Sequence, residues 1–205
     1  MIYSCIIIVI LKPKIKKPNA RGNIPNYNKI DKQKSIKGSQ KKGGKMKPGV
    51  FTQMYIQLVF SPKYRDRLLK KEIRGEVFSY ISGIITNRKH KSIIINGMRD
   101  HMHILIGVNP NDKISDLAGC IKMDSSSFIN SNNWFRGKFH WQDGYGAFSY
   151  GRSQLDKIYN YITNQEIHHR RRTFREEYLE LLKRFEIEHN EKYLFEFFDS
   201  SADTN

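Results

Sequence analysis

The chain has 205 residues, of which 36 are lysine or arginine and 20 are aspartate or glutamate, so its formal net charge is +16. This surplus excludes an acidic protein and makes a polyanion such as nucleic acid the first partner to consider. Hydrophobic residues make up 39% and aromatic residues 12%, which is enough to build a core. Two cysteines, Cys5 and Cys120, are too few for a disulfide framework or a cysteine zinc site, as is typical of cytosolic proteins.

The positive charge is concentrated near the N-terminus. Residues 1–45 hold 12 lysine or arginine residues against one acid, whereas residues 46–205 hold 24 against 19. Low hydrophobicity combined with like charge predicts a disordered basic extension over residues 1–45, followed by one folded domain over residues 46–205. Met46 directly precedes the first well-patterned segment, so a translation start at Met46 is an alternative explanation of the extension.

One apolar run, at residues 6–11, lies within this extension. It is too short to span a membrane, and its flanks do not have the order of charged and small residues that marks a signal peptide. We therefore expect a cytoplasmic protein with no membrane partner.

The first half of the folded region is predicted to contain a strand, a helix and two strands. Residues 54–60 (MYIQLVF) are rich in β-branched and aromatic side chains, which is typical of a strand. Apolar residues recur at spacings of three and four over residues 67–89, which predicts a helix. The apolar runs at 92–98 and 101–108 are separated by a turn short enough for a hairpin.

The second half continues with a helix, a strand and two more helices. A helix is expected over residues 114–129, and the aromatic run at 139–150 predicts a strand with an irregularity at one of its glycines. Asn111 or Asp112 is a plausible N-cap of the first of these helices. Further helices are expected over residues 153–169, capped by Ser153, and 173–187.

This β-α-β-β-α-β order predicts an α+β protein. Two crossover helices around a four-stranded antiparallel sheet form the ferredoxin-like arrangement, which RRM-like modules share. The two last helices would be C-terminal additions to that arrangement.

The segment 100–106 (DHMHILI) carries the first candidate site. Side chains alternate faces along a strand, so His101 and His103 share one face and Met102 and Ile104 the other. Two imidazoles at adjacent same-face positions can chelate one metal ion. The alternative is two surface histidines on a half-buried strand.

The helix at 153–169 presents a second group. Tyr161, Gln165 and His168 fall within about 60° of the helix circumference. The Gln165 amide oxygen is suited to complete a metal site. The alternative for Tyr161 is an aromatic side chain used in packing.

Together these motifs resemble a known family. Residues 101–103 (HMH) resemble the His-hydrophobe-His (HUH) motif, and residues 161–165 (YITNQ) resemble the Tyr-x-x-x-Gln helix of single-tyrosine HUH transposases, the insertion-sequence-200-like enzymes and their repeat-associated relatives. The likeness runs from about residue 51 to 198 and leaves residues 1–45 without a counterpart. Three further segments carry it, at 55–60 (YIQLVF), 143–149 (DGYGAFS) and 164–169 (NQEIHH).

The resemblance implies a transposase that nicks and rejoins single-stranded DNA at hairpin-marked element ends. Tyr161 would form a 5′-phosphotyrosine intermediate, and His101, His103 and Gln165 would hold one divalent ion. Mixed nitrogen and oxygen ligands suit Mg²⁺ or Mn²⁺. In this family the enzyme is a homodimer in which Tyr161 and Gln165 would serve His101 and His103 of the partner in trans.

Basic and imidazole side chains are available to contact the DNA backbone. These candidates are Lys63, Arg65, Arg67, Arg88, His168, His169, Arg170, Arg171 and Arg172. The alternative for each cluster is a solvated charged face. A different class of function also stays open, that of a non-catalytic or domesticated hairpin DNA- or RNA-binding protein of the same fold.

Overall fold

The computed structural model describes residues 51–64 and 69–198. The predicted basic extension, the domain boundary after residue 45, and the candidate DNA contacts Arg65 and Arg67 lie outside the described residues.

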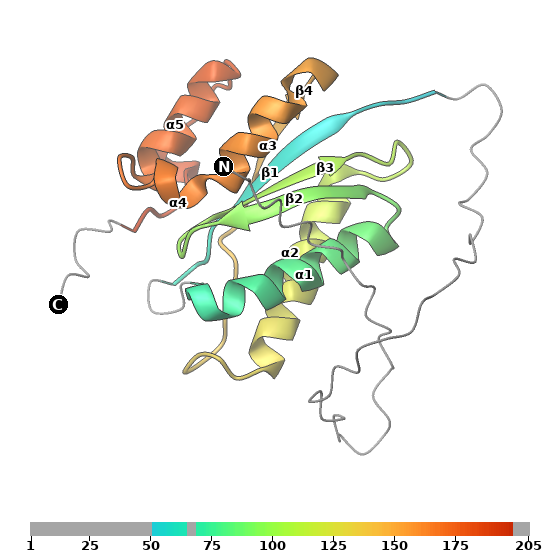
Figure 1. Cartoon of the computed structure of the whole chain (residues 1–205). Coiled ribbons are helices and arrows are strands. Elements are labelled where there is room, and N and C mark those ends of the chain that lie inside the picture. The colour runs from blue at the N-terminus through green and yellow to red at the C-terminus, as the bar shows by residue number, and fades with distance from the viewer. Residues whose placement is uncertain (1–50, 65–68, 199–205) are drawn as a thin grey trace, which may run out of the picture. The chain divides into compact units, whose positions relative to one another are not determined.

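The centre of the fold is a four-stranded antiparallel sheet, which confirms the predicted α+β class (Figure 1). Its strands follow the spatial order β2-β3-β1-β4, so β1 lies between β3 and β4. The strands are β1 (Tyr55–Phe60), β2 (Lys91–Gly97), β3 (Met102–Gly107) and β4 (Gly146–Tyr150). This order is that of the predicted ferredoxin-like sheet.

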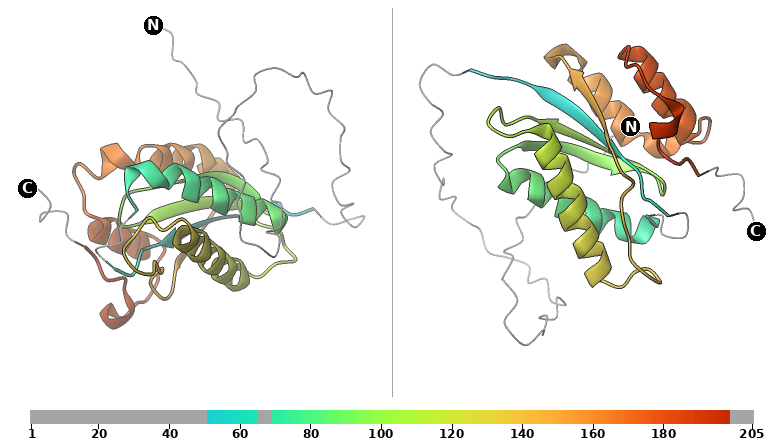
Figure 2. Two further views of the ribbon diagram at one scale, coloured as in Figure 1. Left: turned by 90° about the horizontal axis from the view of Figure 1, so that it is seen from below. Right: turned by 180° about the vertical axis from the view of Figure 1, so that it is seen from behind.

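Helices cover both faces of the sheet (Figures 1 and 2). One face is packed against α1 (Lys71–Asn87) and α2 (Ile114–Ser131). The other is packed against α3 (Leu155–Thr163), the single turn α4 (Gln165–His168) and α5 (Phe174–Arg184). Within the described ranges no helix is both long and apolar enough to cross a membrane.

The two faces of β3 show why the sheet is buried on both sides. Met102 and Ile104 belong to the apolar cluster beneath α1 and α2. His103 and Leu105 point the opposite way, and Leu105 belongs to the cluster formed with α3 and α5. His101 and His103 are fully buried, so the alternative that they lie on the protein surface is excluded.

The helix predicted over residues 153–169 is interrupted. It begins as a 3-10 turn at Arg152–Gln154, whose N-cap is Gly151 and not the predicted Ser153, continues as α3, and breaks at Asn164 before α4. The amide nitrogen of Asn96, on β2, donates hydrogen bonds to the carbonyls of Ile162 (2.8 Å) and Thr163 (3.0 Å). Because the last carbonyls of α3 are bound by a side chain from the sheet, the helix can end there without leaving them unpaired.

Two predicted details near chain turns are wrong. Neither Asn111 nor Asp112 caps α2, whose N-cap residue is Lys113. The Asp112 carboxylate instead accepts hydrogen bonds from Arg88 and His90. The strand predicted over 139–150 is shorter, because only β4 forms a strand there, but the predicted irregularity is present at Gly144, whose positive φ of 72° turns the chain ahead of β4.

Candidate active site

His101, just before β3, and His103, within it, are held by polar partners on their Nδ1 atoms. Asp100 Oδ1 lies 2.8 Å from His101 Nδ1. Gln57, on β1, lies with its amide nitrogen 2.7 Å from His103 Nδ1, and its amide oxygen accepts a hydrogen bond of 2.7 Å from the Tyr150 hydroxyl. These contacts leave the two Nε2 atoms facing the layer of α3, α4 and α5. Such outer partners orient histidine ligands in metal sites.

Helix α3 is fixed on the sheet by apolar packing. Ile158 and Ile162 are buried in the cluster that includes Val59 and Leu105. Burying side chains of this size contributes about 1.5–3 kcal/mol each. This packing holds Tyr161, one residue before Ile162, beside His103.

The structure brings Tyr161 and Gln165 to the predicted histidine pair. The Tyr161 and His103 rings lie 5.9 Å apart, centroid to centroid. Gln165 is fully buried, and its Oε1 lies 3.2 Å from His101 Nε2. The predicted residues Tyr161, His101, His103 and Gln165 thus form one cluster within a single chain.

Glu177 on α5 was missed by the sequence analysis, although it is the most connected residue of the site. Its carboxylate is 2% exposed and lies 3.3 Å from the Nε2 atoms of both His101 and His103. It also accepts hydrogen bonds from Tyr161 and Gln165 and lies 2.9 Å from His169 Nε2. The sequence contains a signal for this role, because Glu177 lies three residues after Phe174 on the apolar stripe of its helix. An acidic residue on a stripe that faces the core is a candidate buried functional group.

Charge in this buried cluster is balanced around Glu177. Burial alone would raise its pKa, but the neighbouring histidines, His103 first, hold the pKa well below its ordinary value. Burial is also the main reason why the pKa of His103 is lowered. The pKa of Tyr161 is raised, first by burial and then by the negative charge of Glu177.

The donor set fits a divalent cation. Ligand atoms of His101, His103 and Glu177 all lie within 4.8 Å of one another, and those of His168, His169 and Glu177 form an overlapping group. His103 Nε2 is buried and makes no hydrogen bond within the described part of the chain. Its neighbour is the Glu177 carboxylate at 3.3 Å, so an imidazole nitrogen and a carboxylate oxygen, both suitable metal ligands, face each other in a buried site.

Comparison with known proteins identifies the family. The family model described as IS200-like transposase matches residues 50–165, which is more than half of the chain. The chain belongs to the IS200-like transposase family. The matched range contains His101, His103, Tyr161 and Gln165 and ends before Glu177.

The chain is also similar to individual transposases and to solved structures. The chain is 27% identical to the IS200 transposases of Salmonella typhimurium and Salmonella typhi over 113 residues, which is 53% of this chain and 74% of each relative. Among solved structures, a Deinococcus radiodurans chain described as a transposase is 23% identical, with a TM-score of 0.47 over 59% of this chain and 97% of that one. A REP-associated tyrosine transposase bound to a REP hairpin is 12% identical, with a TM-score of 0.47 over 62% and 74%.

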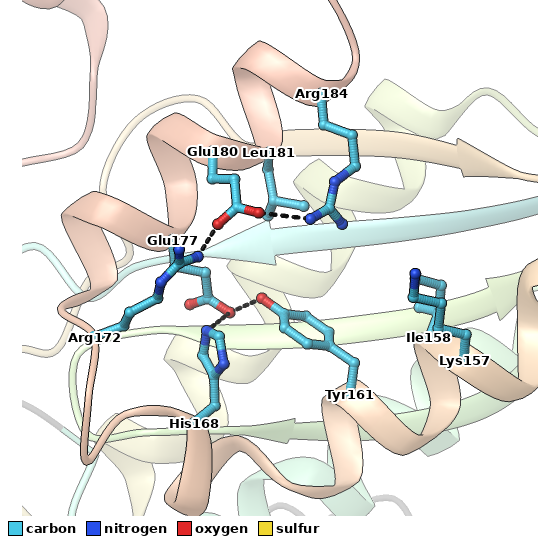
Figure 3. Close-up of a pocket in the computed structure, with 9 residues that line it drawn as sticks. All are labelled: Lys157, Ile158, Tyr161, His168, Arg172, Glu177, Glu180, Leu181 and Arg184. Carbon is cyan, nitrogen blue, oxygen red and sulfur yellow. Dashed lines mark hydrogen bonds and ion pairs between the residues drawn. The ribbon is translucent and has the colours of Figure 1, made fainter.

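A cavity of about 180 Å³ in this transposase opens beside Tyr161, between α3 and α5 (Figure 3). Lys157, Arg172 and Arg184 contribute cationic side chains to its wall. Glu180 forms ion pairs with both Arg172 and Arg184. Glu177 and Glu180 also line the cavity, so it combines a phenol with cations that carboxylates partly neutralise.

The other predicted DNA contacts have varied environments in the transposase. Lys63 is exposed just after β1, Arg88 pairs with Asp112, His168 and His169 turn toward Glu177, and Arg170 and Arg171 are exposed after α4. Only some of these side chains are therefore free to reach a DNA backbone without first breaking an ion pair.

Proposed function

We propose that this transposase nicks and rejoins single-stranded DNA through a covalent link to Tyr161. The observation that carries the proposal is the contact of the Tyr161 hydroxyl with the buried cluster of His101, His103, Gln165 and Glu177. A tyrosine used only for packing has no need of two oriented histidines and a buried carboxylate. Lys157, Arg172 and Arg184 line the cavity beside the phenol and are available to contact a phosphate, the two arginines after they leave Glu180.

In the proposed step, Tyr161 Oη attacks the phosphorus of the scissile linkage. The new bond joins the tyrosine oxygen to the 5′ phosphate, and the bond to the 3′ oxygen of the preceding nucleotide breaks. Glu177 holds the hydroxyl through the hydrogen bond that Tyr161 donates to it, the phenolic proton passes to solvent as the bond forms, and the departing 3′ oxygen takes up one proton from solvent. Attack by a 3′-hydroxyl on the same phosphotyrosine reverses the step, so joining needs no ATP.

His101, His103 and Gln165 would hold the divalent ion, for which we propose Mg²⁺ or Mn²⁺. Bound there, the ion polarises the phosphoryl oxygen and offsets the charge that develops on it. His103 would bind through Nε2 and carry its proton on Nδ1. The Gln57 amide oxygen would then accept a hydrogen bond from this Nδ1–H. This requires the Gln57 amide to be turned over, so that its NH₂ group donates to the Tyr150 hydroxyl, which can act as an acceptor.

The proposed substrate is single-stranded DNA marked by hairpins, as the family resemblance implies. A homodimer that shares its sites in trans is part of the same resemblance. However, Tyr161 lies against the histidines of its own chain in this structure. We therefore propose that one chain contains all the side chains that the reaction needs, whether or not two copies associate.

A cleavage assay tests this function. Labelled single strands that cover the gene's own flanks are incubated with the full-length protein and Mg²⁺ or Mn²⁺. We expect cleavage by wild type, none after chelation, and none by Tyr161→Phe. Tyr159→Phe is the matched control, because Tyr159 lies on the same helix and is 46% exposed. Hairpin binding that persists in wild type without any cleavage would favour the non-catalytic binding protein.

A further inference from the structure

We propose that Glu177 is itself a ligand of the divalent ion, together with His101, His103 and Gln165. This inference rests on the proposed function and deepens it. The family match ends at residue 165, twelve residues before Glu177, so the assignment comes from the geometry of this chain.

The distances among the ligand atoms carry the first step. Glu177 Oε2 lies 3.3 Å from His101 Nε2, and Glu177 Oε1 lies 3.3 Å from His103 Nε2. Two ligands bound to one ion at about 2.0–2.3 Å are separated by about 3 Å when they subtend a right angle. The three side chains are therefore spaced as neighbouring ligands and need little movement to bind one ion.

The orientation of the groups carries the second step. His103 Nε2 is fully buried and forms no hydrogen bond with any described residue, and the Glu177 carboxylate faces it at 3.3 Å. When Nε2 carries no proton, its lone pair faces an anionic oxygen, and two buried acceptors held together in this way cost free energy unless a cation lies between them. A cation between this nitrogen and the Glu177 oxygens would satisfy both groups.

The packing of α5 shows that Glu177 is placed by the fold. Thr173 caps this helix through a reciprocal pair of hydrogen bonds with Glu176. One residue later, the Phe174 ring stacks on His101 with ring centroids 4.2 Å apart and an interplanar angle of 2°. Since residues three apart share a helix face, this stacking directs Glu177 to the same histidine.

A purely structural role is the competing explanation. Four imidazoles approach Glu177, because His168 and His169 lie 3.8 Å and 2.9 Å from its carboxylate. On that view the carboxylate is only a counter-charge for protonated histidines. A ligand needs its carboxylate oxygens at the correct positions for ion binding. A counter-charge needs only its negative charge near the histidines.

The experiment measures Mn²⁺ binding to the full-length protein without DNA, by electron paramagnetic resonance of the free ion. Wild type is compared with Glu177→Gln, Glu177→Asp and His103→Ala. Glu188→Gln serves as the control, because Glu188 is an exposed acid in the loop after α5. Circular dichroism and the thermal midpoint report whether each variant is folded.

If Glu177 is a ligand, Glu177→Gln weakens Mn²⁺ binding by at least about tenfold, since a site loses affinity when it loses ligand charge. Glu177→Asp keeps the charge but withdraws the oxygens by one methylene, so it also weakens binding, and it decides the question if Glu177→Gln does not fold. Loss of binding in His103→Ala with wild-type affinity in Glu177→Asp and Glu177→Gln overturns this inference but leaves the proposed ion site intact. If wild type does not bind Mn²⁺, or if His103→Ala binds it as tightly as wild type, both the role of Glu177 and the proposed ion site are overturned.

Discussion

The hydroxyl of Tyr161 donates a hydrogen bond to the buried carboxylate of Glu177, a residue on a different helix. This contact joins the proposed nucleophile to the proposed ion site. It also explains why the phenol needs help, because burial and the charge of Glu177 both raise the pKa of Tyr161. A cation bound at Glu177 would offset its negative charge and so lower the pKa of Tyr161. We therefore expect activation of the nucleophile and binding of the ion to depend on the same side chains.

The Nδ1 partners of the two histidines are expected to set ion affinity. Asp100→Asn and Gln57→Leu each remove a group that orients a ligand ring. Loss of such partners typically lowers metal affinity by about 10–100-fold. Isothermal titration of Mn²⁺ into each variant measures the effect, with Asp116→Asn on the exposed side of α2 as the control. Wild-type affinity in both variants would show that the rings are fixed by packing alone.

The side chain of Asn96 is expected to stabilise both the fold and the site. Asn96→Ala leaves the carbonyls of Ile162 and Thr163 without their side-chain donor. Each such hydrogen bond contributes about 0.5–1.5 kcal/mol, so we expect urea unfolding to show a loss of about 1–3 kcal/mol. Because the break between α3 and α4 places Gln165, Mn²⁺ affinity should also fall. Asn132→Ala, at the exposed end of α2, is the comparison, and an equal loss there would argue against a special role for Asn96.

Acid stability should depend on Asp112. Its pKa is lowered to about 2, first by its hydrogen bond with Arg88 and then by that with His90. An unfolded aspartate titrates near pH 3.9, so this group stabilises the fold above about pH 4 and loses that contribution as the pH falls toward 2. Urea unfolding of wild type and Asp112→Asn at several pH values measures the difference. We expect the two proteins to converge in stability at the acid end, whereas a constant gap would contradict the assignment.

Mixing two inactive variants tests where the site is assembled. Tyr161→Phe lacks the nucleophile and His103→Ala lacks a proposed ligand, so neither should cut DNA alone. Because Tyr161 lies against His103 of the same chain, we expect their mixture to remain inactive. Recovery of cleavage in the mixture, checked against each variant at twice the concentration, would instead establish sharing between two copies.

Much of the fold and of the site could be predicted from the sequence, because local patterns encode it. Alternation along 101–108 places His101 and His103 on one face, and helical spacing brings Tyr161 and Gln165 near each other. Glu177 could not be assigned in that way, since its role depends on how α5 packs against β3 in three dimensions. The break at Asn164 was missed for the same reason, because its cause is Asn96 on a distant strand.

The central claim is tested most directly by locating the DNA adduct on the protein. Wild-type protein is incubated with single strands from the gene's flanks and Mg²⁺ or Mn²⁺, digested with trypsin, and analysed by mass spectrometry. The account predicts a nucleotide joined through its 5′ phosphate to Tyr161, absent after chelation and in Tyr161→Phe. Cleavage that persists in Tyr161→Phe, or an adduct on another residue, would contradict it.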